Sequence, residues 1–182
     1  SNREQFMDDL ITHTSVRIPV RDVDLEVELD TLSGNPGTTM DYSMTLTNSG
    51  TDPDDFLLSI ERCEGCDAWG VELSTVFIED LEEGSSYDFE FSVEIPVSAR
   101  NTDWAEMRVV ATSTANSSKS DFVNTTTNVN KIFNNQIIWG GLQILNPGDA
   151  SQFEITLVNT GNSIQSYTFD SNQFPSGWDF EN

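Results

Sequence analysis

Apolar and polar residues alternate along most of the chain, a period of two that is typical of strands with one buried face. In residues 87–95, five apolar residues alternate with three acids and a serine. Residues 24–30 alternate in the same way, with Leu25, Val27 and Leu29 between acids. Similar stripes predict strands around residues 41–47, 56–60, 69–73, 107–111 and 122–129. The pattern therefore predicts about seven short strands and no long helix.

Turn residues separate these stripes. Ser33-Gly34-Asn35-Pro36-Gly37 is expected to be a turn, and Asn48-Ser49-Gly50 is expected to end a strand. Asn and Gly tolerate the left-handed backbone that a sharp turn needs. A loop over residues 100–103 is expected to precede Trp104. Short strands with turns between them predict an all-β chain with the architecture of a two-sheet sandwich.

One stretch of the chain occurs twice. Asn35-Pro36-Gly37 leads into a strand that ends at Asn48-Ser49-Gly50, and Asn146-Pro147-Gly148 leads into one that ends at Asn159-Thr160-Gly161. The offset is constant at 111 residues, as from Asn35 to Asn146. That period is too long for a solenoid and suits tandem β-sandwiches. We therefore predict immunoglobulin-like antiparallel β-sandwich repeats.

The repeat divides the chain into three parts. Residues 21–130 are expected to form one complete sandwich, and residues 131–182 the first half of a second. Residues 1–20 are expected to be a terminal strand or leader from a preceding repeat. Apolar residues at helical spacing leave a short helix over residues 3–11 as an alternative.

Several residues of the second part have expected counterparts in the first. Ile137-Ile138-Trp139 would stand where Glu26-Val27 stands, and the aromatic residues Tyr167, Phe169 and Trp178 would repeat Phe56, Leu58 and Trp69. Half a sandwich leaves an apolar face and strand edges uncovered. A neighbouring chain or strand exchange through residues 131–182 is the favoured way to cover them. Residues 1–20, the first domain or a continuing array are the alternatives.

A family resemblance lies in the order of the turn and core signatures. The chain resembles the CARDB and alpha-galactosidase-associated Ig-like repeats in Pro36-Gly37, Tyr42 to Leu46, Asn48-Ser49-Gly50, Phe56, Trp69, Leu81 to Gly84, Val93 to Pro96 and Val109 to Ser113. These modules recur in surface and secreted proteins of archaea and bacteria. The resemblance implies an extracellular spacer, adhesion or substrate-presenting module, and it implies no catalytic residues.

The charge of the chain narrows the range of partners. There are 31 acidic and 8 basic residues, for a net charge of -23. Such a surface repels phosphate backbones and anionic lipid, so binding to nucleic acid or to a membrane surface is not expected. No run of 18 apolar residues occurs, so no direct membrane insertion is expected of this segment.

Cys63-Glu64-Gly65-Cys66 has the spacing of redox and zinc motifs. A zinc site needs four ligands and no second cysteine pair exists, whereas a thioredoxin-like role needs a βαβ unit that the pattern does not predict. The favoured interpretation is a small disulfide that pins the loop before Trp69 in an oxidising compartment. Free thiols and metal or redox chemistry are the alternatives.

The acidic turn Asp52-Pro53-Asp54-Asp55 offers oxygen ligands for a calcium ion. The EF-hand spacing is absent, so solvated turn acids are the favoured interpretation. Calcium through Asp52, Asp54 and Asp55 stays as the alternative, and no other cofactor is expected.

Catalytic chemistry is not expected. The single histidine, His13, lies in the N-terminal segment, so a serine–histidine triad is disfavoured, and no glycine-rich phosphate loop occurs. The many acids lie on the wet faces of strands and not in a pocket pattern.

Three surface residues are candidates for other roles. Asn116 and Asn124 head the glycosylation sequons Asn-Ser-Ser and Asn-Thr-Thr, and Trp104 is the candidate for a surface contact. Chance sequons are common in a chain so rich in Asn, Ser and Thr.

The expected function is structural. The chain is predicted to be a non-catalytic extracellular or cell-surface segment of a tandem array, which spaces, presents or adheres through neighbouring repeats or surface proteins. A carbohydrate- or protein-binding accessory module is one alternative. A subunit of a filament or surface lattice, completed by strand exchange, is the other.

Overall fold

A computed structural model of the chain describes residues 17–141, 144–149, 151–152 and 154–168. Every regular element within these residues is a strand. The strands are β1 (Asp24–Val27), β2 (Thr31–Gly34), β3 (Thr39–Thr47), β4 (Asp54–Arg62), β5 (Gly70–Leu73), β6 (Phe77–Leu81), β7 (Ser86–Glu94), β8 (Trp104–Ser113), β9 (Ser120–Val129), β10 (Asn135–Trp139) and β11 (Ile155–Asn159).

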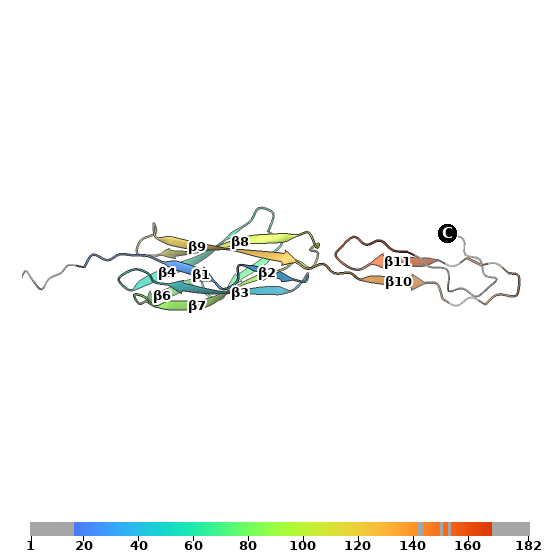
Figure 1. The fold of residues 1–182 in the computed structure, drawn as a ribbon, viewed down its shortest axis with the longest axis horizontal. Helices are drawn as coiled ribbons and strands as arrows, with labels where there is room; N and C mark the ends of the chain where they lie inside the picture. Colours follow the sequence, from blue (N-terminus) through green and yellow to red (C-terminus); the bar gives the residue numbers. More distant parts are fainter. Residues whose placement is uncertain (1–16, 142–143, 150, 153, 169–182) are drawn as a thin grey trace, which may run out of the picture.

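The first nine strands form two sheets that pack face to face (Figure 1). One sheet has the order β1-β3-β7-β5 and the other the order β2-β9-β8-β4-β6. All pairs are antiparallel except β2 and β9, which run parallel. The predicted all-β, immunoglobulin-like sandwich is therefore confirmed, with one parallel pair added to the antiparallel arrangement.

The alternating stripes place one face of each strand in a shared core. Along β7, Phe89, Phe91 and Val93 are buried, whereas the acids between them are exposed. Burying such side chains contributes roughly 1.5–3 kcal/mol each, so the stripe dictates which face turns inward. The largest fully buried side chains are Tyr42, Phe56, Phe91, Met44, Leu46, Ile95, Met107, Val93, Val109, Asn48, Thr125 and Thr127.

The first predicted strand, residues 24–30, is shorter in the structure. β1 ends at Val27 and pairs with β3, the chain crosses over at residues 28–30, and β2, which was not predicted, pairs with β9 in the other sheet. Ser33 and Gly34, expected in a turn, end β2 instead. A Cβ on Gly34 would lie 2.8 Å from the ends of the Ile95 and Met40 side chains, so glycine leaves room for these side chains where β2 borders the core.

One further strand was not predicted. Residues 77–81 form β6, which the sequence pattern did not predict because Ile78 is its one fully buried residue. As expected, a loop precedes Trp104, which is the first residue of β8 and pairs with Asn128.

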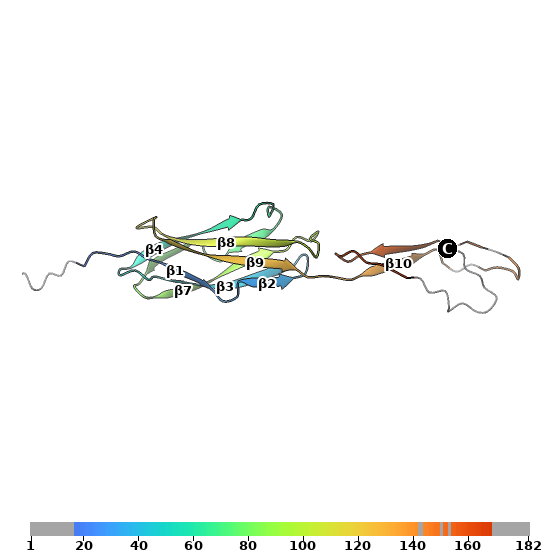
Figure 2. The same cartoon turned by 45° about the horizontal axis from the view of Figure 1, so that its top comes forward.

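β10 and β11 form a separate two-stranded sheet after a connection of residues 130–134. Figure 2 shows β9 leading into β10 beyond the end of the sandwich. Gln136 pairs with Val158 and Ile138 with Thr156, as Asp24 pairs with Thr47 and Glu26 with Thr45. The β10–β11 register therefore reproduces the β1–β3 register.

This correspondence shifts the sequence alignment of the second part by one residue. Counted by register, Ile137 occupies the place of Leu25 and Trp139 the place of Val27. The expectation that Ile137-Ile138 stands at Glu26-Val27 was wrong, because the segment from Trp139 to Asn146 is one residue shorter than the segment from Val27 to Asn35. Ile137 and Trp139 are 61% and 63% exposed, whereas Leu25 is 3% exposed.

Candidate functional site

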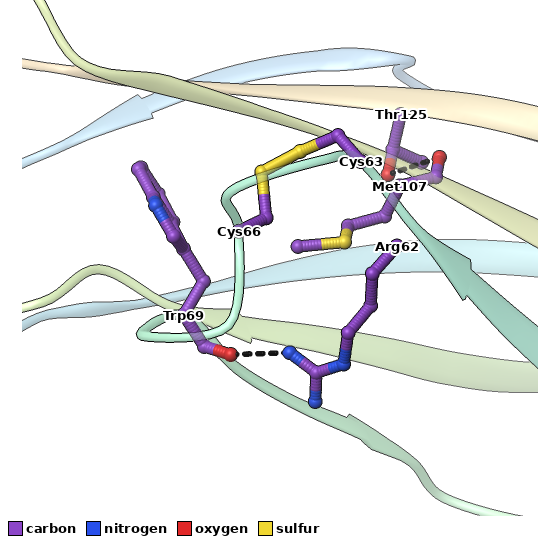
Figure 3. The surroundings of a disulfide bond; sticks show 6 residues. All are labelled: Arg62, Cys63, Cys66, Trp69, Met107 and Thr125. Atoms are coloured by element: carbon purple, nitrogen blue, oxygen red, sulfur yellow. Dashed lines mark hydrogen bonds between the residues drawn. A yellow bond between two sulfur atoms is a disulfide. The ribbon is translucent and has the colours of Figure 1, made fainter.

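The sequence motif Cys63–Cys66 is a disulfide in the structure (Figure 3). It closes the loop between β4 and β5, and the Cys63 amide extends the ladder by donating to the Glu106 carbonyl at 3.2 Å. Cys66 is buried, and Arg62 Nη1 donates to the Trp69 carbonyl at 2.6 Å. Figure 3 shows the Trp69 ring beside the bridge. The disulfide thus holds the turn that presents buried Trp69 to the core.

The three aspartates of the acidic turn serve three different structural contacts. Asp52 accepts the Thr51 hydroxyl, and Asp55 accepts the Asp80 amide at 2.7 Å. Asp54 is buried at 5% exposure and accepts the Ser113 hydroxyl at 2.5 Å. In the described part of the chain, no three His, Cys, Asp or Glu side chains group as metal ligands. The expectation of solvated turn acids is therefore wrong for Asp54, which is buried and hydrogen-bonded, and calcium binding by this turn stays an alternative prediction.

Asp54 also carries an ion pair. Arg21 Nη1 lies 3.9 Å from Asp54 Oδ2, and the same guanidinium donates to the Pro53 carbonyl. Removing one partner from a buried pair is costly, because the other charge is left without compensation. Asp54 consequently ties the N-terminal connection and the β8–β9 turn to the start of β4.

The two sequon asparagines occupy different positions on the surface. Asn116 lies exposed in the β8–β9 turn, and its Oδ1 accepts both the amide and the hydroxyl of Ser118, at 3.2 and 2.8 Å. Asn124 lies exposed in the middle of β9 and accepts Arg108 Nε at 3.1 Å. Both side chains are accessible for a glycan, so glycosylation stays a prediction at either position.

Trp104 is 57% exposed at the start of β8, where it pairs with Asn128 near the end of β9. On the same outer sheet face, the Arg108 guanidinium lies 4.3 Å above the Phe122 ring, and Phe122 is 50% exposed. Cation–π contacts of this exposed kind contribute about 0.5–1 kcal/mol. The predicted contact residue is therefore accessible, and the structure adds Phe122 to the exposed aromatic residues of this face.

The outer face of the other sheet is acidic. Eight carboxylates alternate with the core residues, and β1, β3, β5 and β7 contain neither lysine nor arginine; the acids are Asp24, Glu26, Glu28, Asp41, Glu72, Asp88, Glu90 and Glu94. The hollow above Ser43 is shallow and open to solvent. Such a face repels polyanions.

The turn after β3 is a feature whose role the sequence analysis missed. Asn48 was assigned only to a strand end, yet its side chain is fully buried. Its Nδ2 donates to the carbonyls of Asp52 and Leu81 at 2.9 and 2.7 Å, and its Oδ1 accepts the Gly50 amide at 2.9 Å. The only sequence signal for it is that Asn-x-Gly recurs at residues 159–161.

The turn also forms hydrogen bonds with the segment of chain that leads into the sandwich. Thr51 N donates to the Val20 carbonyl at 2.8 Å, and the Val20 amide donates to the Thr51 hydroxyl at 2.9 Å. A Cβ on Gly50 would lie 2.6 Å from the Val20 carbonyl, so this close approach requires glycine. The Asn48–Thr51 turn therefore fixes the direction in which the chain enters β1.

Some expectations fall on residues that the structure does not describe. These are the expected strand, leader or helix within residues 1–16, His13, Phe169 and Trp178. Residues 17–20 are described and contain no strand. Among the described residues, no helix is long and apolar enough to cross a membrane.

Comparison with protein-family models finds no match, and no curated protein matches the chain. Solved structures show distant likeness. A FixG-related protein from Vibrio parahaemolyticus has a TM-score of 0.43 and 10% identity, covering 60% of this chain and 95% of that one. Domains 4 and 5 of the S-layer protein SbsC have a TM-score of 0.40 and 14% identity, covering 62% and 53%. The SrpA adhesin from Streptococcus sanguinis has a TM-score of 0.43 and 8% identity, covering 61% and 58%. The immunoglobulin-like assignment accordingly rests on the strand order and pairing of this chain.

Proposed function

We propose that the chain is a non-catalytic structural module, a segment of a tandem array of Ig-like sandwiches that spaces or presents other parts of an extracellular surface protein. The observation that carries the proposal is the repeated register: β10 and β11 pair as β1 and β3 do. On this proposal residues 21–130 are one domain and residues 131–182 begin the next. The resemblance to CARDB repeats points the same way and stays a prediction.

The chemistry of the described surface supports this role. The Cys63–Cys66 disulfide suits an oxidising, extracellular compartment. The acidic turn residues are engaged in structural hydrogen bonds, and the acidic sheet face is open and shallow. A rigid sandwich with short connections sets reach and orientation, which is the mechanical task of a spacer.

A second candidate function, a subunit of a filament or lattice, is supported by the exposed apolar face of the β10–β11 hairpin. Ile137, Trp139 and Ile155 are exposed there, whereas the corresponding face of β1 and β3 is buried by the other sheet. A strand from a partner chain could cover this face and pair with its edges, as in strand-exchanged assemblies. This would make the chain a subunit of a filament or lattice.

A third candidate is a binding module for protein or carbohydrate. It is favoured by the exposed aromatic residues Trp104 and Phe122 on one outer sheet face. Aromatic residues are enriched in the contact surfaces of proteins, where they bury a large area.

Light scattering of the full chain over a wide concentration range separates the three. A spacer is expected to have the mass of one chain at every concentration and an elongated scattering profile. Association that Ile137→Asp abolishes and Trp104→Asp leaves intact would contradict the spacer and support the partner-completed assembly. Saturable binding to a glycan array or a surface protein that Trp104→Asp abolishes would instead support the binding module.

A further inference from the structure

The contacts of the Asn48–Thr51 turn recur in the second part of the chain. Asn159 Nδ2 donates to the Ser163 carbonyl at 2.7 Å, and the Gly161 amide donates to Asn159 Oδ1 at 3.0 Å. These bonds match those from Asn48 to Asp52 and from Gly50 to Asn48. The same turn is therefore built twice, at an offset of 111 residues.

The pair of hydrogen bonds between this turn and the segment that precedes the domain recurs as well. The Ile132 amide donates to Asn162 Oδ1 at 2.8 Å, and the Asn162 amide donates to the Ile132 carbonyl at 3.3 Å. Val20 and Thr51 make this pair of bonds in the first sandwich. A Cβ on Gly161 would also clash with the Ile132 carbonyl, as one on Gly50 would with Val20. Asn162 and Thr51 thus perform the same task with different side chains.

At the second turn, a preceding domain is in place. Asn162 Nδ2 donates to the Asn130 carbonyl at 2.8 Å, directly after β9 of the first sandwich. The Asn101 amide, from the loop between β7 and β8, donates to the Asn162 carbonyl at 3.3 Å. The turn therefore forms an interface with the first sandwich. It contacts the end of that sandwich that carries the C-terminus of β9 and the β7–β8 loop.

At the first turn, the same surface is open. Ile18 and Val20 are 77% and 51% exposed beside it, whereas Ile132, the counterpart of Val20, is half-buried. Among the backbone hydrogen bonds of the described residues, no amide donates to the Thr51 carbonyl, whereas the Asn101 amide donates to the Asn162 carbonyl.

We propose that the surface formed by Val20, Gly50 and Thr51 is a docking site for the β9-exit end of another sandwich of this kind. The inference rests on the proposed function, and it adds that successive domains are held by polar contacts at a defined angle. Interfaces between domains of one chain are often small and permit relative motion. Here the connection between the two domains is held by hydrogen bonds through both the amide and the carbonyl of Ile132, which restricts the relative motion of the domains.

An extended chain tests this directly. It joins residues 1–131 to residues 20–182, so that Val20 follows Lys131 in the place of Ile132 and a complete sandwich precedes the Thr51 turn. Spin labels on Ser43→Cys in both copies report the distance between the two sandwiches, since Ser43 is exposed on the outer face of β3. Docking predicts one narrow distance distribution. A broad distribution in the unmutated extended chain overturns the proposal.

Variants of the second copy identify the contact. Thr51→Val keeps the shape and removes the hydroxyl that accepts the Val20 amide, so it is expected to broaden the distribution severalfold. Thr51→Asn, which copies Asn162, should restore it. Thr45→Val removes an exposed hydroxyl that bonds Asp88 away from the docking surface, and it should change nothing. An unchanged distribution for Thr51→Val would contradict the assigned contact.

The outcomes for the two proposals are separable. A broad distance distribution in a monomeric extended chain refutes docking and leaves the spacer role standing. Association through the β10–β11 hairpin refutes the spacer role, whatever the labels report within one chain.

Discussion

The fully buried side chain of Asn48 shows how one polar residue can organise several loops. It bonds the carbonyls of Asp52 and Leu81 and the amide of Gly50, and so joins the turn after β3 to the end of β6. Buried polar groups are stabilising when every donor and acceptor is paired, and costly when a partner is lost. Among the described side chains, no buried nitrogen or oxygen lacks a hydrogen-bond partner.

Replacing this residue is therefore expected to be severe. Asn48→Ala removes three hydrogen bonds, two of them to partly buried carbonyls, so it should lower the free energy of unfolding by about 2–4 kcal/mol. Urea unfolding of the full chain measures the loss. Asn159→Ala is the matched control, because it alters the equivalent turn outside the complete sandwich. A loss of equal size in the sandwich transition for both variants would contradict the role given to Asn48.

Tyr42 connects the two sheets at a single point. Its ring stacks on Phe91 with centroids 5.9 Å apart, and its hydroxyl contacts Thr127 Oγ1 at 2.7 Å and donates to the Thr126 carbonyl at 2.9 Å. Burial raises the pKa of Tyr42 above its ordinary value of 10.0. The neutral phenol is therefore the form that the folded protein accommodates.

A pH dependence follows from the direction of that shift. Below pH 10 the phenol is neutral in both states, and the stabilisation is complete. Above the ordinary tyrosine pKa the unfolded chain ionises first, so stability should fall as the pH rises through the raised folded pKa. Tyr42→Phe should cost about 1–3 kcal/mol at neutral pH and should flatten the alkaline decline. Urea midpoints measured from pH 7 to 11 test this, and an unchanged alkaline slope in Tyr42→Phe would contradict it.

At the scale of elements, what could be predicted followed the strength of the two-residue period. β7 was expected over almost its true length, because five apolar residues alternate with polar ones. β6 was missed because Ile78 is its one fully buried residue, and Asp80 adopts a positive φ of 50° where the β4–β6 register shifts. β2 was missed because its Ser33-Gly34 end resembles a turn, although pairing with β9 makes it a strand.

The candidate contacts were harder to predict than the strands. The Cys63–Cys66 bridge follows from spacing and cysteine count, since no other cysteine exists. The roles of Thr51 and Asn162 depend on which carbonyl passes nearby, and that is set by pairing between strands far apart in sequence. The local sequence pattern identifies the Asn-x-Gly turn, but it does not identify the backbone groups that the turn contacts.

The disulfide loop permits a prediction at this scale. Closing so short a loop removes little chain entropy, so Cys63→Ser with Cys66→Ser should cost no more than about 2 kcal/mol. The loss should be local, because the bridge spans only the turn before Trp69. Tryptophan fluorescence is expected to show greater quencher access, whereas the amide exchange of β7 should stay unchanged. Global unfolding of the double variant would contradict a local role.

At the scale of the whole molecule, the described residues form one sandwich followed by a hairpin of the same pattern. Figure 1 shows the hairpin continuing along the long axis of the sandwich. The first sandwich has its own buried core, so its fold does not depend on β10 and β11. The two exposed faces differ in character: one sheet presents carboxylates, and the other presents Arg108, Phe122 and Trp104. The two sheets therefore present chemically different outer faces to solvent.

The parallel pairing of β2 with β9 has a mechanical consequence. Thr31 to Gly34 run beside Thr126 to Val129, and the chain enters the sandwich ahead of β2 and leaves it after β9 at the opposite end. Tension applied to the two ends of the domain therefore loads the β2–β9 pair in shear, along the direction of the strands. Hydrogen bonds that lie across the strands then share the load and must rupture together, whereas a pair pulled apart from one end opens bond by bond. The crossover between β1 and β2 thus places a strand pair that is loaded in shear between the two ends of the domain, and such a pair is expected to resist stretching.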